Sequence, residues 1–254
     1  REVLDKLSSL REKSNIEFKE EQYEEIVNNK EVTNNINVLV RTKEQLKAAK
    51  EYKVNIITSN KELLDDDIYY KVPRDNYIHE YNYPKLLVTD YASLIKYKNN
   101  MSDYFLNVTN HYSLDYISKY ASSVMLSVEL NKNKIKDIMD KYTNKPNVEV
   151  LVYGNIELML TKFCPIKYNV NKDKVCNACK NNTYYLKDRN NKYYYIDTNA
   201  NHGTSILDYK KVDLIDDIKE YKEMGVTNYR IELLEEDYIK TKEIIERVIN
   251  NNEW

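Results

Sequence analysis

The chain has 254 residues, of which 42% are apolar and 31% are charged, and its formal net charge is −2. No apolar run approaches the length that crosses a membrane. A slightly acidic chain also lacks the overall basic charge of a nucleic-acid-binding domain. With only three glycines and four prolines, the sequence disfavours a loop-rich β-sandwich and predicts long regular elements.

The first 33 residues predict a helical leader. They are rich in Glu and Lys, with apolar residues such as Leu4, Leu7 and Leu10 at helical spacing. The chain starts at Arg1, without Met and without a signal-like apolar segment. We therefore interpret residues 1–33 as the tail of a preceding region of a longer protein, and residues 34–254 as the main domain.

The main domain alternates short apolar runs with amphipathic helices. Two adjacent parallel strands need a crossover helix between them, so this alternation predicts a parallel sheet. Eight such strands close a barrel, and the predicted fold is α/β and TIM-barrel-like, either complete or, since some strands are short, incomplete or distorted. The predicted strands are Ile36–Val40, Val54–Thr58, Ile68–Val72, Leu86–Thr89, Tyr104–Val108, Ser123–Val128, Val148–Tyr153 and Asn228–Leu233.

Several helix boundaries are also visible in the sequence. Thr42, followed three residues later by Gln45, forms a capping box at the start of the first helix of the domain. Apolar residues at i, i+3, i+4 and i+7 predict a helix over 134–142, and a similar pattern predicts one over 213–224. Gly225 then stops the latter helix.

Residues 164–204 interrupt the alternation as an insert. Two short runs, 183–187 and 192–197, flank a turn-forming Asp-Arg-Asn-Asn sequence and predict a β-hairpin. All three cysteines of the chain, with one histidine, also lie in this insert. Thiolates and imidazoles are metal ligands, so the insert predicts a metal site, although the spacing matches no standard zinc motif. The candidate ligands are Cys164, Cys176, Cys179 and His202. Cys176 and Cys179 have two residues between them and leave Cys164 as an odd cysteine. This arrangement suits a reducing cytoplasm better than a disulfide framework.

Polar residues at the carboxyl ends of barrel strands are the candidates for binding and catalysis. Those at the predicted strand ends are Arg41, Thr58, Arg74, Asp90, Thr109, Asn110, Glu129, Gly154 and Glu157. Arg230 and Glu232 stand two residues apart inside the last strand and so share one face of it. If that face is the barrel lumen, both charges need partners, and Asn107 and Glu149 are the candidate partners in other strands. The catalytic candidates are therefore Arg230, Glu232, Asn107 and Asn110.

Successive sequence blocks resemble a known family. They are F-L-N-V-T-N (105–110), L-S-V-E-L-N (126–131), V-E-V-L-V-Y-G (148–154), K-F-C-P-I (162–166), Y-L-K-D-R (185–189) and Y-R-I-E-L-L (229–234). Their order and spacing over about residues 36–250 are similar to the collagenase-like U-32 peptidase family, and most of all to the second, C-terminal barrel of its long members. Some long members are similar to proteins that hydroxylate a cytidine of ribosomal RNA.

The resemblance bears on the metal site. Members of that kind carry an iron–sulfur cluster on four cysteines, and three of these match Cys164, Cys176 and Cys179. Where the family has its last cysteine, this chain has His202. A set of three cysteines and one histidine suits zinc as well as an iron–sulfur cluster, so zinc, an iron–sulfur cluster and no metal all stay open.

The resemblance also implies a function. We expect the parent protein to act in hydroxylation of an RNA base, with this domain supplying a metal site or a surface that positions the substrate. A peptidase, as the family name says, is the first alternative, and a non-catalytic interaction barrel is the second. The expected partners are the N-terminal region of the same protein and, through that region, RNA. No membrane partner is expected, and the expected location is the cytoplasm.

Overall fold

The structure is a computed structural model of the chain, and it describes residues 2–12, 33–74, 80–142, 147–170, 179, 182–198 and 203–252. Among these residues, no helix is long and apolar enough to cross a membrane. Helix α1 (Glu2–Glu12) lies within the predicted leader, and its Val3 and Leu4 side chains are exposed.

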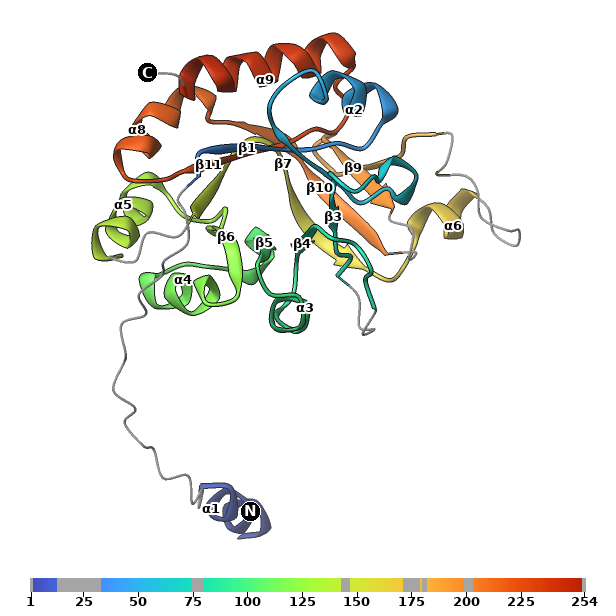
Figure 1. Cartoon of the computed structure of the whole chain (residues 1–254). Coiled ribbons are helices and arrows are strands. Elements are labelled where there is room, and N and C mark those ends of the chain that lie inside the picture. The colour runs from blue at the N-terminus through green and yellow to red at the C-terminus, as the bar shows by residue number, and fades with distance from the viewer. Residues whose placement is uncertain are drawn as a thin grey trace.

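Eight parallel strands close into a barrel (Figure 1). Each strand pairs in parallel with the next along the chain, and the last, β11, pairs with both β1 and β7, which closes the ring. The strands are β1 (Asn35–Leu39), β2 (Asn55–Thr58), β3 (Tyr69–Lys71), β4 (Leu86–Val88), β5 (Asn100–Ser102), β6 (Ala121–Met125), β7 (Asn147–Thr161) and β11 (Asn228–Glu232). The predicted TIM-barrel-like fold with parallel strands is confirmed.

Helices cover the outside of the barrel (Figure 1). They bury apolar side chains against the outer faces of the strands, in the largest core cluster of the molecule. The α-helices of the barrel are α2 (Lys43–Ala49), α3 (Tyr91–Lys96), α4 (His111–Ser118), α5 (Lys132–Lys141), α8 (Ile218–Glu223) and α9 (Tyr238–Asn252), and short 3-10 turns are η1 (Lys61–Leu63), η2 (Tyr104–Leu106) and η3 (Ile215–Asp217).

The predicted helix signals are confirmed for α2 and α5, whereas the helix predicted over 213–224 begins only at Ile218, because Asp213 belongs to a strand and Ile215–Asp217 forms η3. Thr42 caps α2 by accepting a hydrogen bond from the backbone N–H of Gln45, whose side chain accepts one in return. Helix α5 buries Ile135 and Ile138, as its periodicity predicts. Gly225 follows α8 with a φ of 94°, a left-handed conformation that favours glycine.

The predicted fifth strand, Tyr104–Val108, is wrong in position. Strand β5 lies earlier, and Tyr104–Leu106 forms η2 instead. Asp103 caps this turn by accepting a hydrogen bond from the Tyr104 N–H at 2.7 Å, and Asn107 ends it in a left-handed conformation with φ 52°. An apolar run of three residues cannot by itself distinguish a strand from a buried turn. Of the predicted range, only Val108 makes a sheet contact, as a single bridge to Leu126.

An antiparallel extension is built onto one strand of the barrel. The second half of β7 runs past the barrel and pairs with β10 (Thr204–Asp213), which pairs in turn with β9 (Tyr193–Thr198). Strand β8 (Tyr185–Lys187) completes the extension by pairing with β9. The predicted hairpin is therefore confirmed as β8–β9. Strand β10 is not among the predicted elements, because register shifts interrupt its pairing with β7 and its burial pattern has no regular period of two. Helix α6 (Pro165–Val170) lies between β7 and β8 in the chain.

The barrel interior contains a buried ion pair. Arg230 is fully buried and donates two hydrogen bonds to the two carboxylate oxygens of Glu149, both at 2.8 Å. Asn37 donates a third bond to Glu149 at 2.7 Å. Burial disfavours the charge of Arg230, but the attraction of Glu149 outweighs it and raises the pKa of Arg230 above its ordinary value. Above this layer, Leu39, Ile57, Leu87 and Met101 form an apolar layer of the lumen.

We expect Arg230→Ala to lower the free energy of unfolding by about 3–5 kcal/mol, because it leaves the Glu149 carboxylate buried without its partner. Arg189→Ala, in the exposed turn of the β8–β9 hairpin, should change it by less than about 0.5 kcal/mol. Replacing both partners, as Arg230→Met with Glu149→Leu, should recover most of the loss. Urea unfolding measures all three. Equal stability of the two single variants would contradict a buried pair.

Candidate functional site

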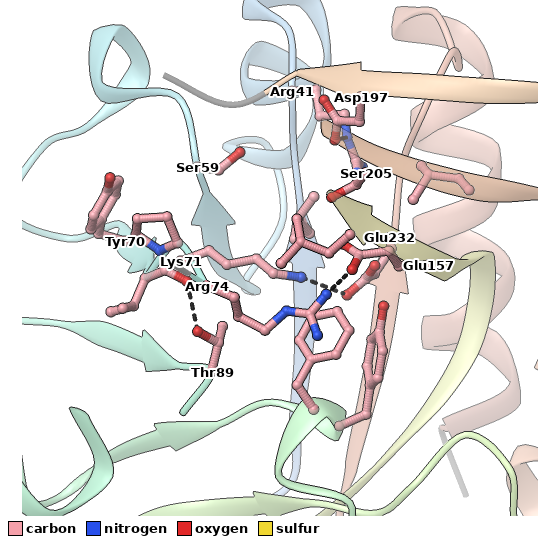
Figure 2. Close-up of a pocket in the computed structure, with 17 residues that line it drawn as sticks. Arg41, Ser59, Tyr70, Lys71, Arg74, Thr89, Glu157, Asp197, Ser205 and Glu232 are labelled. Atoms are coloured by element: carbon pink, nitrogen blue, oxygen red, sulfur yellow. Dashed lines mark hydrogen bonds and ion pairs between the residues drawn. The ribbon is translucent and has the colours of Figure 1, made fainter. Parts of the chain in front are cut away.

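A pocket lies at the carboxyl ends of the barrel strands, where enzymes of this fold place their active sites (Figure 2). The residues that follow or end four strands contribute to it: Arg41 after β1, Ser59 after β2, Lys71 at the end of β3 and Glu232 at the end of β11. The cavity holds about 70 Å³, several times the roughly 10–15 Å³ that one water needs. The antiparallel extension covers one side of it with Asp197, Ser205, Leu207, Glu157 and Leu160.

Glu232 is the most unusual group of this pocket. Its side chain is only 4% exposed, yet its Oε1 accepts no hydrogen bond in the described part of the chain. Lys71 Nζ and Arg230 Nη1 each lie 3.7 Å from that oxygen, too far for a hydrogen bond. Lys71 is instead closer to the Asp103 carboxylate, at 3.0 Å. A buried carboxylate oxygen of this kind is free to accept a hydrogen bond from a ligand.

A flat cation lies against an aromatic ring at the same pocket. The guanidinium carbon of Arg74 is 3.4 Å from the centre of the Phe105 ring, and the Phe105 ring in turn contacts that of Tyr104, with centroids 4.2 Å apart. Arg74 also forms an ion pair with Glu157 of the β7 extension (Figure 2). Stacked guanidinium and aromatic planes form a surface on which another planar group can stack.

Arg41 joins the extension to the barrel. Its Nε lies 3.2 Å from Asp197 Oδ2 in β9, and its Nη1 donates to the backbone carbonyl of Leu233. Burial disfavours the charge of Arg41, but the attraction of Asp197 and Glu232 outweighs it and raises the pKa of Arg41. Arg41 therefore stays charged and holds β9 over the pocket mouth.

Gly154 sets the position of Glu232. It has a φ of 142°, and a Cβ added there would lie 2.8 Å from both the Cβ and the backbone oxygen of Glu232. Only glycine allows this close approach of β7 to β11 at the floor of the pocket. Gly154 is among the strand-end residues predicted from the sequence, and its role is to leave room for Glu232, because it has no side chain.

The structure places some of the predicted candidate residues at the pocket and others away from it. Glu232, Arg41, Arg74 and Glu157 line the pocket, and Arg230 lies beneath it, paired with the predicted partner Glu149. Asn107 and Asn110 are exposed. Asn107 is therefore not part of the lumen network, since it ends η2, and Asn110 caps helix α4 by accepting a hydrogen bond from the Ser113 N–H.

Three residues of the site were missed by sequence reasoning. Lys71, Asp103 and Phe105 all belong to the pocket or its floor. Lys71 ends the third strand inside the predicted range, so it was counted as part of a strand and not as a strand-end charge. Asp103 and Phe105 were missed because the fifth strand was placed too late. An acidic residue directly before an aromatic pair was the available signal, since Asp caps turns.

The predicted metal ligands are only partly described. Cys164 and Cys179 are free thiols of intermediate exposure, and Cys164 Sγ accepts a hydrogen bond from the Lys167 N–H at 3.4 Å. Cys176 and His202 lie outside the described residues. Within the described ranges, no three His, Cys, Asp or Glu side chains are placed to hold a metal ion. Two half-exposed free thiols fit ligand roles, and the convergence of all four residues stays a prediction.

Comparison with known proteins identifies the family. A family model described as peptidase family U32 matches residues 5–250. The chain belongs to peptidase family U32. A search of curated proteins and a search of solved structures each gave no match. The match includes most of the predicted leader, whose boundary at residue 33 stays a prediction.

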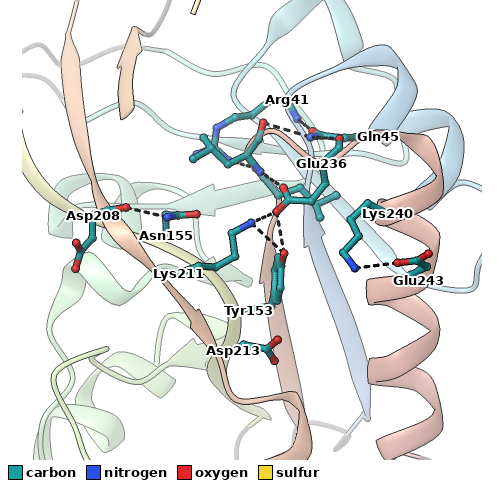
Figure 3. Close-up of polar contacts among 12 residues, drawn as sticks. Arg41, Gln45, Tyr153, Asn155, Asp208, Lys211, Asp213, Glu236, Lys240 and Glu243 are labelled. Atoms are coloured by element: carbon teal, nitrogen blue, oxygen red, sulfur yellow. Dashed lines mark hydrogen bonds and ion pairs between the residues drawn. The ribbon is translucent and has the colours of Figure 1, made fainter. Parts of the chain in front are cut away.

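A second polar cluster of this U32 domain lies beside the pocket (Figure 3). The Glu236 carboxylate accepts hydrogen bonds from the Leu234 N–H at 2.6 Å, from the Tyr153 hydroxyl at 2.9 Å and from Lys211. Gln45 donates to the backbone carbonyl of Glu236 at 3.0 Å. The cluster joins the loop after β11 to β7, β10 and α2, and so holds the end of β11 in place.

This cluster predicts a dependence of stability on pH. Burial raises the pKa of Glu236, but the hydrogen bonds from Lys211 and the Leu234 N–H outweigh it and lower that pKa. A carboxylate with a lowered pKa stabilises the fold above its unfolded pKa of about 4.3, and that stabilisation is lost as the pH falls. Glu236→Gln should therefore be less stable than the parent chain at pH 7, and its stability should fall less steeply between about pH 5 and pH 3.

The matched control is Glu243→Gln, in the exposed Lys240–Glu243 ion pair of α9 (Figure 3). It should follow the pH profile of the parent chain, because exposed pairs contribute little. Urea unfolding at several pH values provides the profiles. A Glu236→Gln stability profile parallel to that of the parent chain would show that these hydrogen bonds do not lower the pKa of Glu236.

Proposed function

We propose that this domain binds a nucleobase in the pocket at the carboxyl ends of its strands, and that its parent protein acts in the hydroxylation of an RNA base. The observation that carries the proposal is the Glu232 carboxylate, which is buried at the pocket floor with an oxygen that accepts no hydrogen bond from the described residues. A bound group that donates a hydrogen bond would satisfy it. We assign no bond-breaking step to this domain.

The type of base follows from the chemistry of the lining residues. A carboxylate accepts a hydrogen bond from the amino group of cytosine, a pairing known from base recognition in nucleic acids. The Arg74–Phe105 pair offers a plane against which a base can stack. Together an acceptor at the floor and a stacking plane at the wall favour a planar ligand with an amino group, and cytosine is our first candidate.

The geometry gives less support to the peptidase alternative. Among the described residues that line the pocket, Ser59 and Ser205 offer hydroxyl groups, and there is no histidine or cysteine. Lys71 is the nearest candidate base, but its Nζ is already engaged in an ion pair with Asp103 at 3.0 Å. A serine nucleophile needs an unprotonated base within hydrogen-bond distance. The third reading, a non-catalytic interaction barrel, does not explain a buried carboxylate oxygen that accepts no hydrogen bond from the described residues.

The metal and the partners belong to the same proposal. We propose Cys164, Cys176, Cys179 and His202 as ligands of zinc or of an iron–sulfur cluster, which would supply Lewis-acid or redox chemistry, respectively, to the parent protein. The two described cysteines are free thiols, in keeping with a location in the reducing cytoplasm. The proposed partners are the N-terminal region of the parent protein and RNA.

We expect Glu232→Gln to weaken the binding of cytidine 5′-monophosphate by roughly 10-fold to 100-fold, because a hydrogen bond to a charged group contributes about 1.5–3 kcal/mol. Isothermal titration calorimetry measures the affinity, with ribose 5-phosphate as the ligand that lacks a base. Glu243→Gln is the matched control, because Glu243 is an exposed acidic residue of α9 that does not line the pocket. Equal binding of the two ligands, or unchanged affinity in Glu232→Gln, would contradict the proposed base site.

The cellular role has its own readout. In cells that lack the parent protein, mass spectrometry of digested RNA should show the loss of one hydroxylated nucleoside. The parent protein should restore it, and so should Glu243→Gln, whereas Glu232→Gln should not. RNA with an unchanged set of nucleosides would contradict the hydroxylation role. The base site would then be judged by the calorimetry alone.

The metal is tested by analysis of the chain purified without oxygen. We expect about one zinc per chain, or iron with sulfide and visible absorption, and we expect either to be lost in the double variant Cys176→Ser with Cys179→Ser. Neither zinc nor iron above the level of the double variant would show that the four residues do not form a metal site.

A further inference from the structure

One face of the antiparallel extension continues out of the pocket. Side chains two apart along a strand share a face, and so do residues directly opposite each other on paired strands. Asp197 of β9 and its partner Ser205 of β10 both line the pocket. Tyr195 and Tyr193 therefore lie on the same face of β9, at successive steps away from the pocket mouth.

Strand β8 extends this face with a further aromatic ring and a cation. Tyr185 is paired with Tyr195, and Lys187 is paired with Tyr193. The Tyr185 ring meets those of Tyr195 and Tyr193 edge to face, with centroids 5.7 and 6.4 Å apart. Lys187 Nζ lies 5.4 Å from the centre of the Tyr193 ring. The face thus carries three contacting tyrosines and a lysine.

The two outermost rings are accessible. Tyr193 is 55% exposed and Tyr185 is 41% exposed, which is unusual for large aromatic side chains that contact each other. Tyr185 is also fixed in direction, because its hydroxyl donates a hydrogen bond to Glu235 after β11. Tyrosines held in place with exposed ring faces form a ready surface for planar groups.

The hairpin and the segment before it are basic in sequence although the whole chain is not, and the acidic Asp197 and Glu235 lie at the inner end of the face, bonded to Arg41 and Tyr185. Residues 158–170 and 182–191 carry Lys162, Lys167, Lys187 and Arg189 against a single acidic residue, Asp188, whereas Lys192 is bonded to Tyr209 on the other face. The whole chain carries 39 Lys and Arg against 41 Asp and Glu. This part of the molecule is therefore complementary to a polyanion.

We propose that the face of β8 and β9 formed by Tyr185, Tyr193, Tyr195 and Lys187 binds single-stranded RNA next to the pocket. Bases that flank the target base stack on the exposed tyrosine rings, and the lysines meet the phosphates. The proposal rests on the base-binding function proposed for the pocket and extends it, because it assigns RNA contact to this domain as well as to the N-terminal region. Unpaired RNA is favoured over a duplex, since stacking needs bases that are free of their partners.

The test uses the whole chain and a fluorescein-labelled single-stranded RNA of 12 mixed nucleotides, with binding followed by fluorescence anisotropy. Tyr193→Ala and Tyr185→Ala should each weaken RNA binding about fivefold to 100-fold, as expected for loss of one base–aromatic stack. Lys187→Ala should weaken it and also reduce its dependence on salt. All three changed side chains are exposed, so the variants should fold.

Tyr209→Ala is the matched control. Tyr209 is 43% exposed in the same extension, but its ring contacts that of Tyr194, which points to the opposite face of β9 from Tyr193 and Tyr195. It should bind RNA as the parent chain does. An equal loss in Tyr209→Ala, no loss in the tyrosine variants, or equal affinity for the 12-nucleotide strand and its duplex would each overturn the proposal. So would binding of an acidic peptide that the tyrosine variants lose while RNA does not bind.

The pocket and the tyrosine face fail separately in these measurements. Glu232→Gln should keep its affinity for a 12-nucleotide strand of uridines within about twofold, because uracil has no amino group to donate to the carboxylate, while it loses cytidine 5′-monophosphate. Tyr193→Ala should show the reverse pattern. Loss of mononucleotide binding with RNA binding unaffected by the tyrosine variants would leave the pocket standing and remove the tyrosine face.

Discussion

The buried ion pair between Arg230 and Glu149 is the constraint on which the pocket depends. Arg230 has five N–H donors, and it commits two of them to Glu149 at 2.8 Å. Arg230 Nη1 lies 3.7 Å from Glu232 Oε1. Glu232 is therefore close to a positive charge but does not form a hydrogen bond with it. A barrel lumen is normally filled by branched apolar side chains. A charge pair placed there needs further hydrogen bonds, and Asn37 supplies one to Glu149, whereas Arg230 Nη1 faces Glu232 and makes no hydrogen bond to the described residues.

The same logic applies one layer higher, at the mouth of the barrel. Lys71 lies between Asp103 and Glu232 and is nearer to the former, while Arg41 and Arg74 hold Asp197 and Glu157 of the antiparallel extension. The cations thus join the extension to the barrel, and the Oε1 of Glu232 at the pocket floor accepts no hydrogen bond from the described residues. Structural ion pairs and a candidate binding group are in this way built from one network, with Gly154 allowing the strands to approach.

Much of the fold could be predicted from the sequence because barrel strands and helices have clear periods. The alternation located seven of the eight barrel strands, and two-residue spacing put Arg230 and Glu232 on one face. The fifth strand could not be located in this way, since Asp103 and Asn107 turn an apolar run into a capped 3-10 turn. Strand β10 could not be predicted either. A bulge interrupts its pairing with β7, and its buried and exposed residues therefore do not follow a regular period of two.

The candidate site was less predictable for a different reason. Strand-end charges could be named one by one, but which of them is satisfied by a neighbour depends on distances of a few tenths of an ångström. The role of the extension could not be predicted from the net charge. The whole chain has a net charge of −2, and this value does not reveal that one segment is basic and rich in tyrosine. Pairing of β8 with β9 is what brings Tyr185 beside Tyr193 and Tyr195.

The most direct test of the account is a crystal structure of the chain with cytidine 5′-monophosphate bound. The account predicts the base in the pocket, with its amino group donating a hydrogen bond to the Glu232 carboxylate and its ring against the Arg74–Phe105 pair, while Arg230 keeps both bonds to Glu149. A nucleotide bound elsewhere would contradict it, and so would a Glu232 carboxylate that is hydrogen-bonded to Lys71 or Arg230 with the pocket closed.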